Sequence, residues 1–213
     1  MSNLTVRANA SGTGTVILES PNTNTNQTVT LPDATTTLVG TDATQTLTNK
    51  TIQGGALTLM TAQNSTSGTV IDFTGIPSWV KRVTVTFNGV STNGVNHVLI
   101  QFGTSSGFQT TGYFSYAGYI QASSVGAVSS TAGAIVTLGV ATVFVTGPVF
   151  FTNHSGSTWA VSGVTAVDTT TTDYVQMMGG GFTLSGVLDR VRITTVGGTD
   201  TFDAGSINVM YEG

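Results

Sequence analysis

The sequence predicts an all-β protein in which an extended N-terminal segment precedes a jelly-roll-like β-sandwich. Charged residues make up only 8% of the chain, against about 25% in typical soluble domains, so the strong helix formers Lys, Glu and Arg are scarce. Threonine supplies about a fifth of the residues, and its branched Cβ, like that of Val, suits a pleated sheet. Short runs of alternating apolar and polar residues, separated by Gly, Asn and Ser, complete the pattern of an all-β chain.

Aromatic residues divide the chain into two regions. Residues 1–55 contain no Phe, Tyr or Trp, whereas all ten Phe, five Tyr and two Trp lie at or after Phe73. Because aromatic side chains dominate core burial, we expect residues 56–213 to build their own core and residues 1–55 to lack one. The Gln53-Gly54-Gly55 step is the candidate hinge between the two regions.

In the first region, residues 15–19 and 28–31 are strand candidates, and Pro21 with the Asn/Thr run 22–26 predicts the turn between them. Leu38, Leu47 and Ile52 follow as isolated apolar residues among polar ones. Single anchors at irregular spacing cannot form a core within one chain. They could do so if several chains met around an axis, each contributing one anchor to every layer.

In the second region, residues 82–87, 97–102, 190–194 and 207–211 alternate with period two and predict half-buried strands. Further strand candidates cover residues 68–73, 112–121, 132–138, 141–151, 157–166 and 173–184. About ten short strands without a helical pattern favour a β-sandwich of jelly-roll type. The expected core includes Phe73, Val85, Phe87, Ile100, Phe102, Ile193 and Val209.

Charge and composition exclude several classes of partner. The net charge is −4, and six basic residues are too few for a groove that tracks phosphates, so we expect no nucleic-acid partner. The absence of Cys excludes disulfides and thiolate metal sites. No apolar run approaches the roughly 20 residues of a membrane span, and residues 1–3 show no secretion signal. A surface of hydroxyls and amides favours permanent assembly, because burying a hydroxyl costs far less than burying an ion.

Two phrases stand out in the N-terminal region, LPDATTTLVG at residues 31–40 and TLTNKTI at residues 46–52. Together they resemble a pattern of tailed-bacteriophage fibre and virion structural proteins. Residues 71–82 and 201–213 also look like phage structural modules. The resemblance implies an extended homotrimeric connector. In such a connector Leu38, Leu47 and Ile52 would lie at the trimer interface, and Asn49 or Thr48 could form hydrogen bonds between chains. It implies a protein on the surface of the phage particle, assembled in the host cytoplasm.

The resemblance leaves two roles open. One is a homotrimeric tail-fibre or adhesin component that binds host surface polysaccharide or a neighbouring virion protein. The other is a capsid decoration or head-fibre protein that stabilises the phage head. The chain has one connector-like segment and is short for a long tail fibre, which keeps the second role in consideration.

Motifs that could support catalysis lack their structural context. Residues 103–107 match the G-x-S-x-G nucleophile elbow around Ser105, but a second strand follows where the elbow needs a helix, which favours a hairpin turn. The two histidines, His97 on a strand and His154 in a turn, lack a second ligand or a base partner at a recognised spacing. We expect no enzyme activity and no cofactor.

Acidic and glycine-rich segments also favour structural roles. Asp168 with Asp173, and Asp200 with Asp203, could offer oxygen ligands to calcium, but no D-x-D-x-D-G loop is present, and we expect no metal site. The glycines at 179–181 lack the Lys and helix of a phosphate-binding loop. They indicate a bulge or close packing instead.

Aromatic side chains in one strand give the best candidate contact surface for a partner or a glycan. Tyr113 and Tyr119 fall on one face of the strand over 112–121, and Phe114 and Tyr116 on the other. One face belongs to the core and the other is a candidate for exposure. Trp159 is a similar case. Candidate contact residues are therefore Tyr113, Tyr116, Tyr119 and Trp159, for each of which core packing is the alternative.

Overall fold

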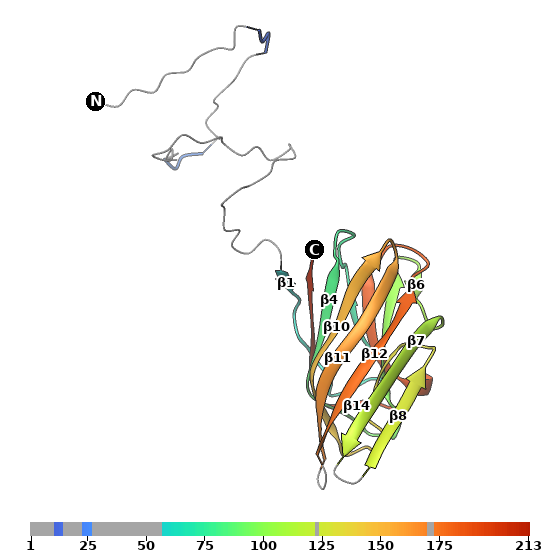
Figure 1. Ribbon diagram of the computed structural model, residues 1–213. Helices are drawn as coiled ribbons and strands as arrows, with labels where there is room; N and C mark the ends of the chain where they lie inside the picture. The colour runs from blue at the N-terminus through green and yellow to red at the C-terminus, as the bar shows by residue number, and fades with distance from the viewer. Residues whose placement is uncertain (1–10, 15–22, 27–56, 122–123, 170–172) are drawn as a thin grey trace, which may run out of the picture. The chain divides into compact units, whose positions relative to one another are not determined.

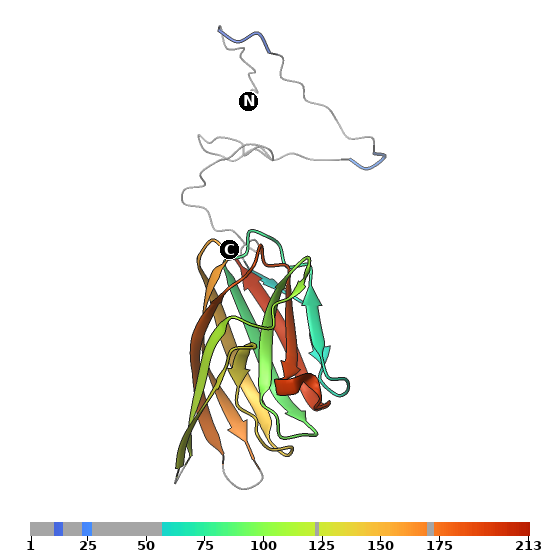
Figure 2. The ribbon, with the colours of Figure 1, turned by 90° about the vertical axis from the view of Figure 1, so that its right-hand side faces the viewer.

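The protein, seen in a computed structural model, is a β-sandwich of two antiparallel sheets (Figures 1 and 2). The structure describes residues 11–14, 23–26, 57–121, 124–169 and 173–213. Within these residues there is no α-helix, and one 3-10 turn spans Val196–Gly198. The all-β prediction is confirmed for this part of the chain.

Fourteen strands build the sandwich. They are β1 Leu57–Leu59, β2 Gln63–Asn64, β3 Ile71–Thr74, β4 Arg82–Thr92, β5 Val98–Thr104, β6 Gly107–Phe108, β7 Tyr113–Gln121, β8 Ser124–Ser130, β9 Ala134–Val136, β10 Phe144–Ser155, β11 Thr158–Asp168, β12 Tyr174–Thr183, β13 Arg190–Thr195 and β14 Phe202–Glu212.

The larger sheet has nine strands in the order β1-β14-β4-β10-β11-β12-β7-β8, with β2 also paired to β14. The first and last strands of the sandwich lie side by side at one edge of this sheet. Leu57 of β1 lies opposite Glu212 of β14, and the C-terminus lies next to β1 (Figure 1). At the other edge, β7 and β8 form a hairpin in which Ile120 lies opposite Val125. This edge carries the aromatic strand that the sequence singled out.

The smaller sheet has five strands in the order β3-β13-β5-β6, with β9 also paired to β5. On β13, Arg192 lies opposite Asp72 of β3. The Arg192 guanidinium donates two hydrogen bonds of 2.7 Å to that carboxylate and lies 4.1 Å from the centre of the Phe108 ring. The outer surface of this sheet is thus charged but paired.

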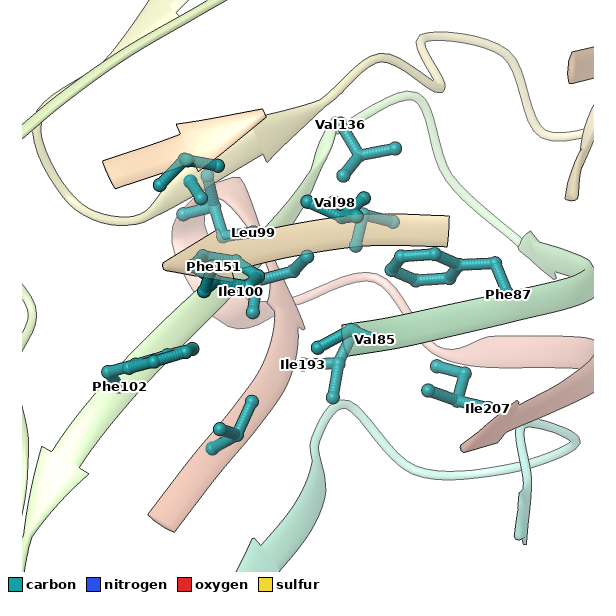
Figure 3. Packing of buried hydrophobic residues seen from close by; sticks show 14 of the residues in the cluster. Val85, Phe87, Val98, Leu99, Ile100, Phe102, Val136, Phe151, Ile193 and Ile207 are labelled. Carbon is teal, nitrogen blue, oxygen red and sulfur yellow. The ribbon is translucent and has the colours of Figure 1, made fainter. Parts of the chain in front are cut away.

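The hydrophobic core lies between the two sheets. Figure 3 shows Val85 and Phe87 of β4 beside Val98 and Ile100 of β5 and Ile193 of β13. Across the layers, the Phe102 ring of β5 lies 4.5 Å from that of Phe151 on β10, centroid to centroid. All seven predicted core residues are buried: Phe73, Val85, Phe87, Ile100, Phe102, Ile193 and Val209.

Two details of the sandwich differ from the sequence prediction. Strands β1 at 57–59, β2 at 63–64 and β8 at 124–130 lie where no strand was expected. The first two are too short to show a period, and Ser and Gly residues mask the alternation of β8. Strand β5 is buried on both faces, so Leu99 and Gln101 are inside rather than on a polar surface. The Gln101 amide there donates 2.8 Å to the Ala132 carbonyl oxygen, which satisfies a polar group inside the core.

Most predictions for the first region lie outside the described residues. These are the strands at 15–19 and 28–31, the hinge at 53–55, and the trimer-interface residues Leu38, Leu47, Asn49 and Ile52. Residues 23–26 are described, and there the Thr25 amide donates to the Thr23 hydroxyl at 3.1 Å. That local bond is typical of a turn, as expected between the two strand candidates.

Candidate functional site

The candidate contact residues separate into buried and exposed sets. Tyr113 and Trp159 are each 3% exposed and lie in the core, which removes them as contacts for a glycan or a partner. Tyr116 is 51% exposed and Phe114 is 66% exposed, on the opposite face of β7. Tyr119 is half-buried. The predicted division of this strand into a core face and an exposed face is confirmed.

Tyr113 has a structural role that its position in the core explains. Its hydroxyl accepts a 2.8 Å hydrogen bond from the Phe102 amide. One edge of β5 pairs with β9 over residues 98–100 and with β6 over residues 103–104. Phe102 lies between these two stretches, where this edge has no strand partner. Burial raises the pKa of Tyr113, which keeps the hydroxyl protonated. The phenol therefore substitutes for a missing strand.

The exposed side of β7, β8, β11 and β12 forms a continuous apolar surface, which we call the outer apolar face. These strands lie next to one another in the larger sheet (Figure 1). The large side chains of the outer apolar face are between 51% and 79% exposed: Phe114, Tyr116, Ile120, Val125, Val164, Val175 and Met177. Cross-strand pairs connect them, since Ile120 lies opposite both Val175 and Val125.

Glycines 179–181 bring the strands of this face close together. Gly181 lies opposite Phe114 and Gly179 opposite Tyr116. A Cβ added to Gly180 would come within 2.0 Å of the Phe114 carbonyl oxygen, so only glycine fits at that position. Close packing, one of the two readings of this segment, is thereby confirmed.

A pocket of about 400 Å3 lies on the inner side of the same strands, where the loop after β9 faces β7 and β12. The rings of Tyr119 and Tyr174 border it, 5.3 Å apart between centroids. The rest of the lining is polar or aliphatic: His97, Gln121, Val128, Thr137, Leu138, Gly139, Val140, Thr142, Val143 and Thr169. Among the described residues that line the pocket there is no Asp, Glu, Lys or Arg, which suits a neutral ligand.

Buried polar side chains fix the loop that forms one wall of this pocket. The Gln176 side chain of β12 is fully buried. Its Oε1 accepts a 2.6 Å bond from the Thr137 amide and another from the Thr137 hydroxyl, and its Nε2 donates 3.1 Å to the Thr137 carbonyl oxygen. The Ser115 hydroxyl of β7 accepts a 2.9 Å bond from the Ile135 amide. Both side chains thus connect β9 and its loop to the larger sheet.

His97 borders the pocket and is neutral at physiological pH. Burial lowers its pKa from the ordinary 6.5. Its Nδ1 accepts a 3.1 Å hydrogen bond from the Leu138 amide, so in the neutral ring the proton is on Nε2. The residue lies just before β5 rather than on the strand as predicted. His97 can offer one N–H donor to a ligand.

The nucleophile-elbow motif is a hairpin, as the sequence favoured. Thr104 of β5 pairs with Gly107 of β6, and exposed Ser105 and Ser106 form the turn. The Thr104 hydroxyl accepts from the Ser106 amide at 3.2 Å. A hollow of about 570 Å3 beside this hairpin has no titratable side chain in its lining. It is wider and less enclosed than the pocket at Tyr119 and Tyr174, and we prefer the latter as the ligand site.

The structure places the acidic residues of the two candidate pairs in different surroundings. Asp200 is buried and its carboxylate accepts from the Asn96 amide at 2.8 Å and from the Asn96 side chain at 2.7 Å, whereas Asp203 is exposed. One Asp173 oxygen accepts from the Thr169 amide at 3.1 Å. Within the residues that the structure describes, no group of three or more His, Cys, Asp or Glu side chains could hold a metal ion.

Sequence reasoning missed Tyr174, Gln176 and the loop over 137–143. Gln176 lies two residues before Met178 on β12 and shares its inward face. A polar residue in phase with core positions was therefore the available signal. Nothing in the sequence indicated that the loop after β9 would lie across Tyr119.

None of the described elements is a helix long and apolar enough to cross a membrane. Comparison with protein-family models finds no match to the chain, and comparisons with curated proteins and with solved structures find none either.

Proposed function

We propose that the chain is a structural protein of a tailed-bacteriophage particle that works by surface contact. The connector-like phrases at residues 31–40 and 46–52 support the phage assignment. The observation that carries the contact role is the outer apolar face. Its four strands contain no Asp, Glu, Lys or Arg other than Asp168, the last residue of β11. Exposed apolar patches of this size mark sites of protein association.

The strand order supports a jelly-roll sandwich as the finer description of the fold. We infer this from successive strands that alternate between the sheets: β2 in the larger, β3 in the smaller, β4 in the larger and β5 in the smaller. The last two strands repeat the alternation, β13 in the smaller sheet and β14 in the larger. Long connections that cross between two sheets are typical of double Greek-key folds.

A role in adhesion is favoured by the pocket at Tyr119 and Tyr174. Two aromatic rings, a neutral imidazole and the Thr142 hydroxyl are groups that can bind the apolar faces and the hydroxyls of a neutral saccharide. We therefore propose host surface polysaccharide as a ligand. Tyr174→Ala should abolish binding of the chain to host cells in a pull-down assay. Val187→Ala, at an exposed position outside both the pocket and the outer apolar face, should retain it.

The position of the chain on the particle tests the phage assignment. Gold-labelled antibodies against residues 57–213 should decorate particles of a phage that encodes the chain. Labels on the tail would support the tail-fibre or adhesin role, and labels on the head would support capsid decoration. The proposal would be overturned if intact particles carry no label and denatured particles are also negative by immunoblot.

We also propose that the assembled form is a homotrimer and that it has no catalytic turnover. Light scattering of the full chain should give the mass of three copies, and a monomer at micromolar concentration would contradict this. Ser105→Ala and Asp203→Asn should leave adhesion and particle assembly unchanged. Cleavage of host polysaccharide that either substitution abolished would overturn the non-enzymatic role.

A further inference from the structure

We infer that the outer apolar face packs against the equivalent face of neighbouring copies of this chain around a common axis. The inference concerns the sandwich itself and stands apart from the phage assignment. It also differs from the predicted interface at Leu38, Leu47, Asn49 and Ile52, which involves the other region of the chain.

The size of the outer apolar face exceeds what a solitary domain exposes. Aromatic side chains present about 150–250 Å2 each, and the seven large side chains of the face are 51% to 79% exposed. If each of the five aliphatic side chains has a somewhat smaller total area, about 150 Å2, the seven together expose an area on the order of 700 Å2. The largest apolar patch of a typical monomer is about 300–600 Å2, whereas each partner in a standard interface contributes about 800 Å2.

The distribution of charge selects a second copy as the occupant. Residues 113–121, 124–130, 158–167 and 174–183 contain no Asp, Glu, Lys, Arg or His. In a two-fold contact a surface meets itself, and around a higher axis the residues nearest the axis meet their own equivalents. A charge at such a position would then face its own sign. The face avoids that repulsion. A contact with a different protein would place no such restriction on charge.

Exposed strands elsewhere in the sandwich do carry charge. Arg192 and Asp72 pair on the smaller sheet, and Arg82 pairs with Glu212 where β4 meets β14. The chain therefore places ion pairs on other strand surfaces and omits them from the outer apolar face. Low total charge alone does not account for that difference.

The geometry of the face suits close approach of two sheets. Glycines at 118, 179 and 181 lie beside the large side chains of β7 and β12, with Gly118 opposite Met177 and Gly181 opposite Phe114. The Phe114 and Tyr116 rings make an edge contact with centroids 4.9 Å apart, so they form a ridge next to these low positions. Ridges of one copy can therefore fill the hollows of another.

The absence of cysteine from the chain allows a direct test. Met177→Cys places a single thiol in the middle of the face, and Val187→Cys places one at a position that is 61% exposed outside it. Both full-length variants are treated with a maleimide at increasing protein concentration. We expect the thiol at position 177 to react at least about tenfold more slowly than that at position 187 once copies associate, with slowing that depends on concentration.

A charge introduced into the face provides the second arm of the test. Val164→Lys in the Met177→Cys background should restore fast labelling, because Val164 lies opposite Met177 and an unpaired ammonium would be buried between copies. Circular dichroism of this double variant checks that it remains folded, and Val125→Lys replaces Val164→Lys if it does not. Equal labelling rates at positions 177 and 187 at every concentration would overturn the inference. That outcome is also the one expected if a different protein covers the face in the particle.

Discussion

Tyr113 and Tyr116 are three residues apart on β7, but Tyr113 lies in the core and Tyr116 is exposed on the outer apolar face. Tyr113→Phe should lower the free energy of unfolding by about 1–3 kcal/mol, because the buried Phe102 amide would lose its only acceptor on that side. Urea unfolding measures the change. Tyr116→Phe removes the same hydroxyl from a 51% exposed side chain and should change stability by less than about 0.5 kcal/mol. Equal losses in both variants would contradict the role given to Tyr113.

His97 should make stability depend on pH in a defined direction. Burial lowers its folded-state pKa below 6.5, so between that lowered value and pH 6.5 the unfolded chain binds a proton that the folded chain excludes. The free energy of unfolding therefore decreases as pH falls through 6.5, and His97 adds no further loss below its lowered pKa.

The matched variants are His97→Asn and His154→Asn. Asn at position 97 can keep an acceptor for the Leu138 amide without binding a proton, so this variant should lose the decrease just below pH 6.5. His154 is exposed near the end of β10 rather than in the turn that the sequence predicted, and its replacement should preserve the decrease. Thermal unfolding across this pH range decides, and identical profiles for wild type and His97→Asn would refute the prediction.

At the scale of elements, β9 and its loop depend on Gln176. Gln176→Leu would leave the Thr137 amide and carbonyl without their partners, at a cost of about 1–3 kcal/mol for each buried group. Hydrogen exchange of the Thr137 amide should accelerate strongly. The Ile135 amide, bound to Ser115 instead, serves as an internal control and should remain more protected. Uniform acceleration at both amides would indicate global unfolding rather than a local loss.

Strands with clean alternation could be predicted from the sequence, and others could not. In residues 82–87 and 207–211 the apolar residues mark one face, and these became β4 and β14 of the larger sheet. In β8, small residues leave only Val125 and Val128 as a weak signal. The positions of Leu99 and Gln101 were predicted wrongly because β5 is covered on both faces. Burial by other parts of the chain is not visible as an alternation within the strand's own sequence.

The candidate site was predictable only in part, for a related reason. Phe114 and Tyr116 were placed on one face by period two alone. The pocket joins Tyr119, Tyr174 and His97, which lie far apart in the chain and meet through the order of strands in the sheet. Local patterns do not determine that order.

At the scale of the molecule, residues 57–213 should fold alone. Deleting residues 1–55 should leave β-type circular dichroism and a cooperative melt, since the buried core residues that the structure describes all lie between Ile71 and Val209. In the full chain, Phe87→Ala should cost about 3–5 kcal/mol at a 1% exposed site. Phe114→Ala, on the outer apolar face, should leave a dilute monomer nearly as stable. A shortened chain without a cooperative melt would contradict the prediction.

The pairing of β1 with the end of β14 determines how the sandwich responds to mechanical tension. Leu57 lies opposite Glu212, and Thr58 opposite Tyr211. A force that pulls Leu57 away from Gly213 therefore unzips this pair one bond at a time, which requires little force. If the load is instead carried by the far strands β7 and β8, a pull on Leu57 along the strand axis loads the bonds of β1 together, in shear. The three-residue strand β1 would thus resist a much larger force when the opposing load is held by β7 and β8 than when it is held by Gly213.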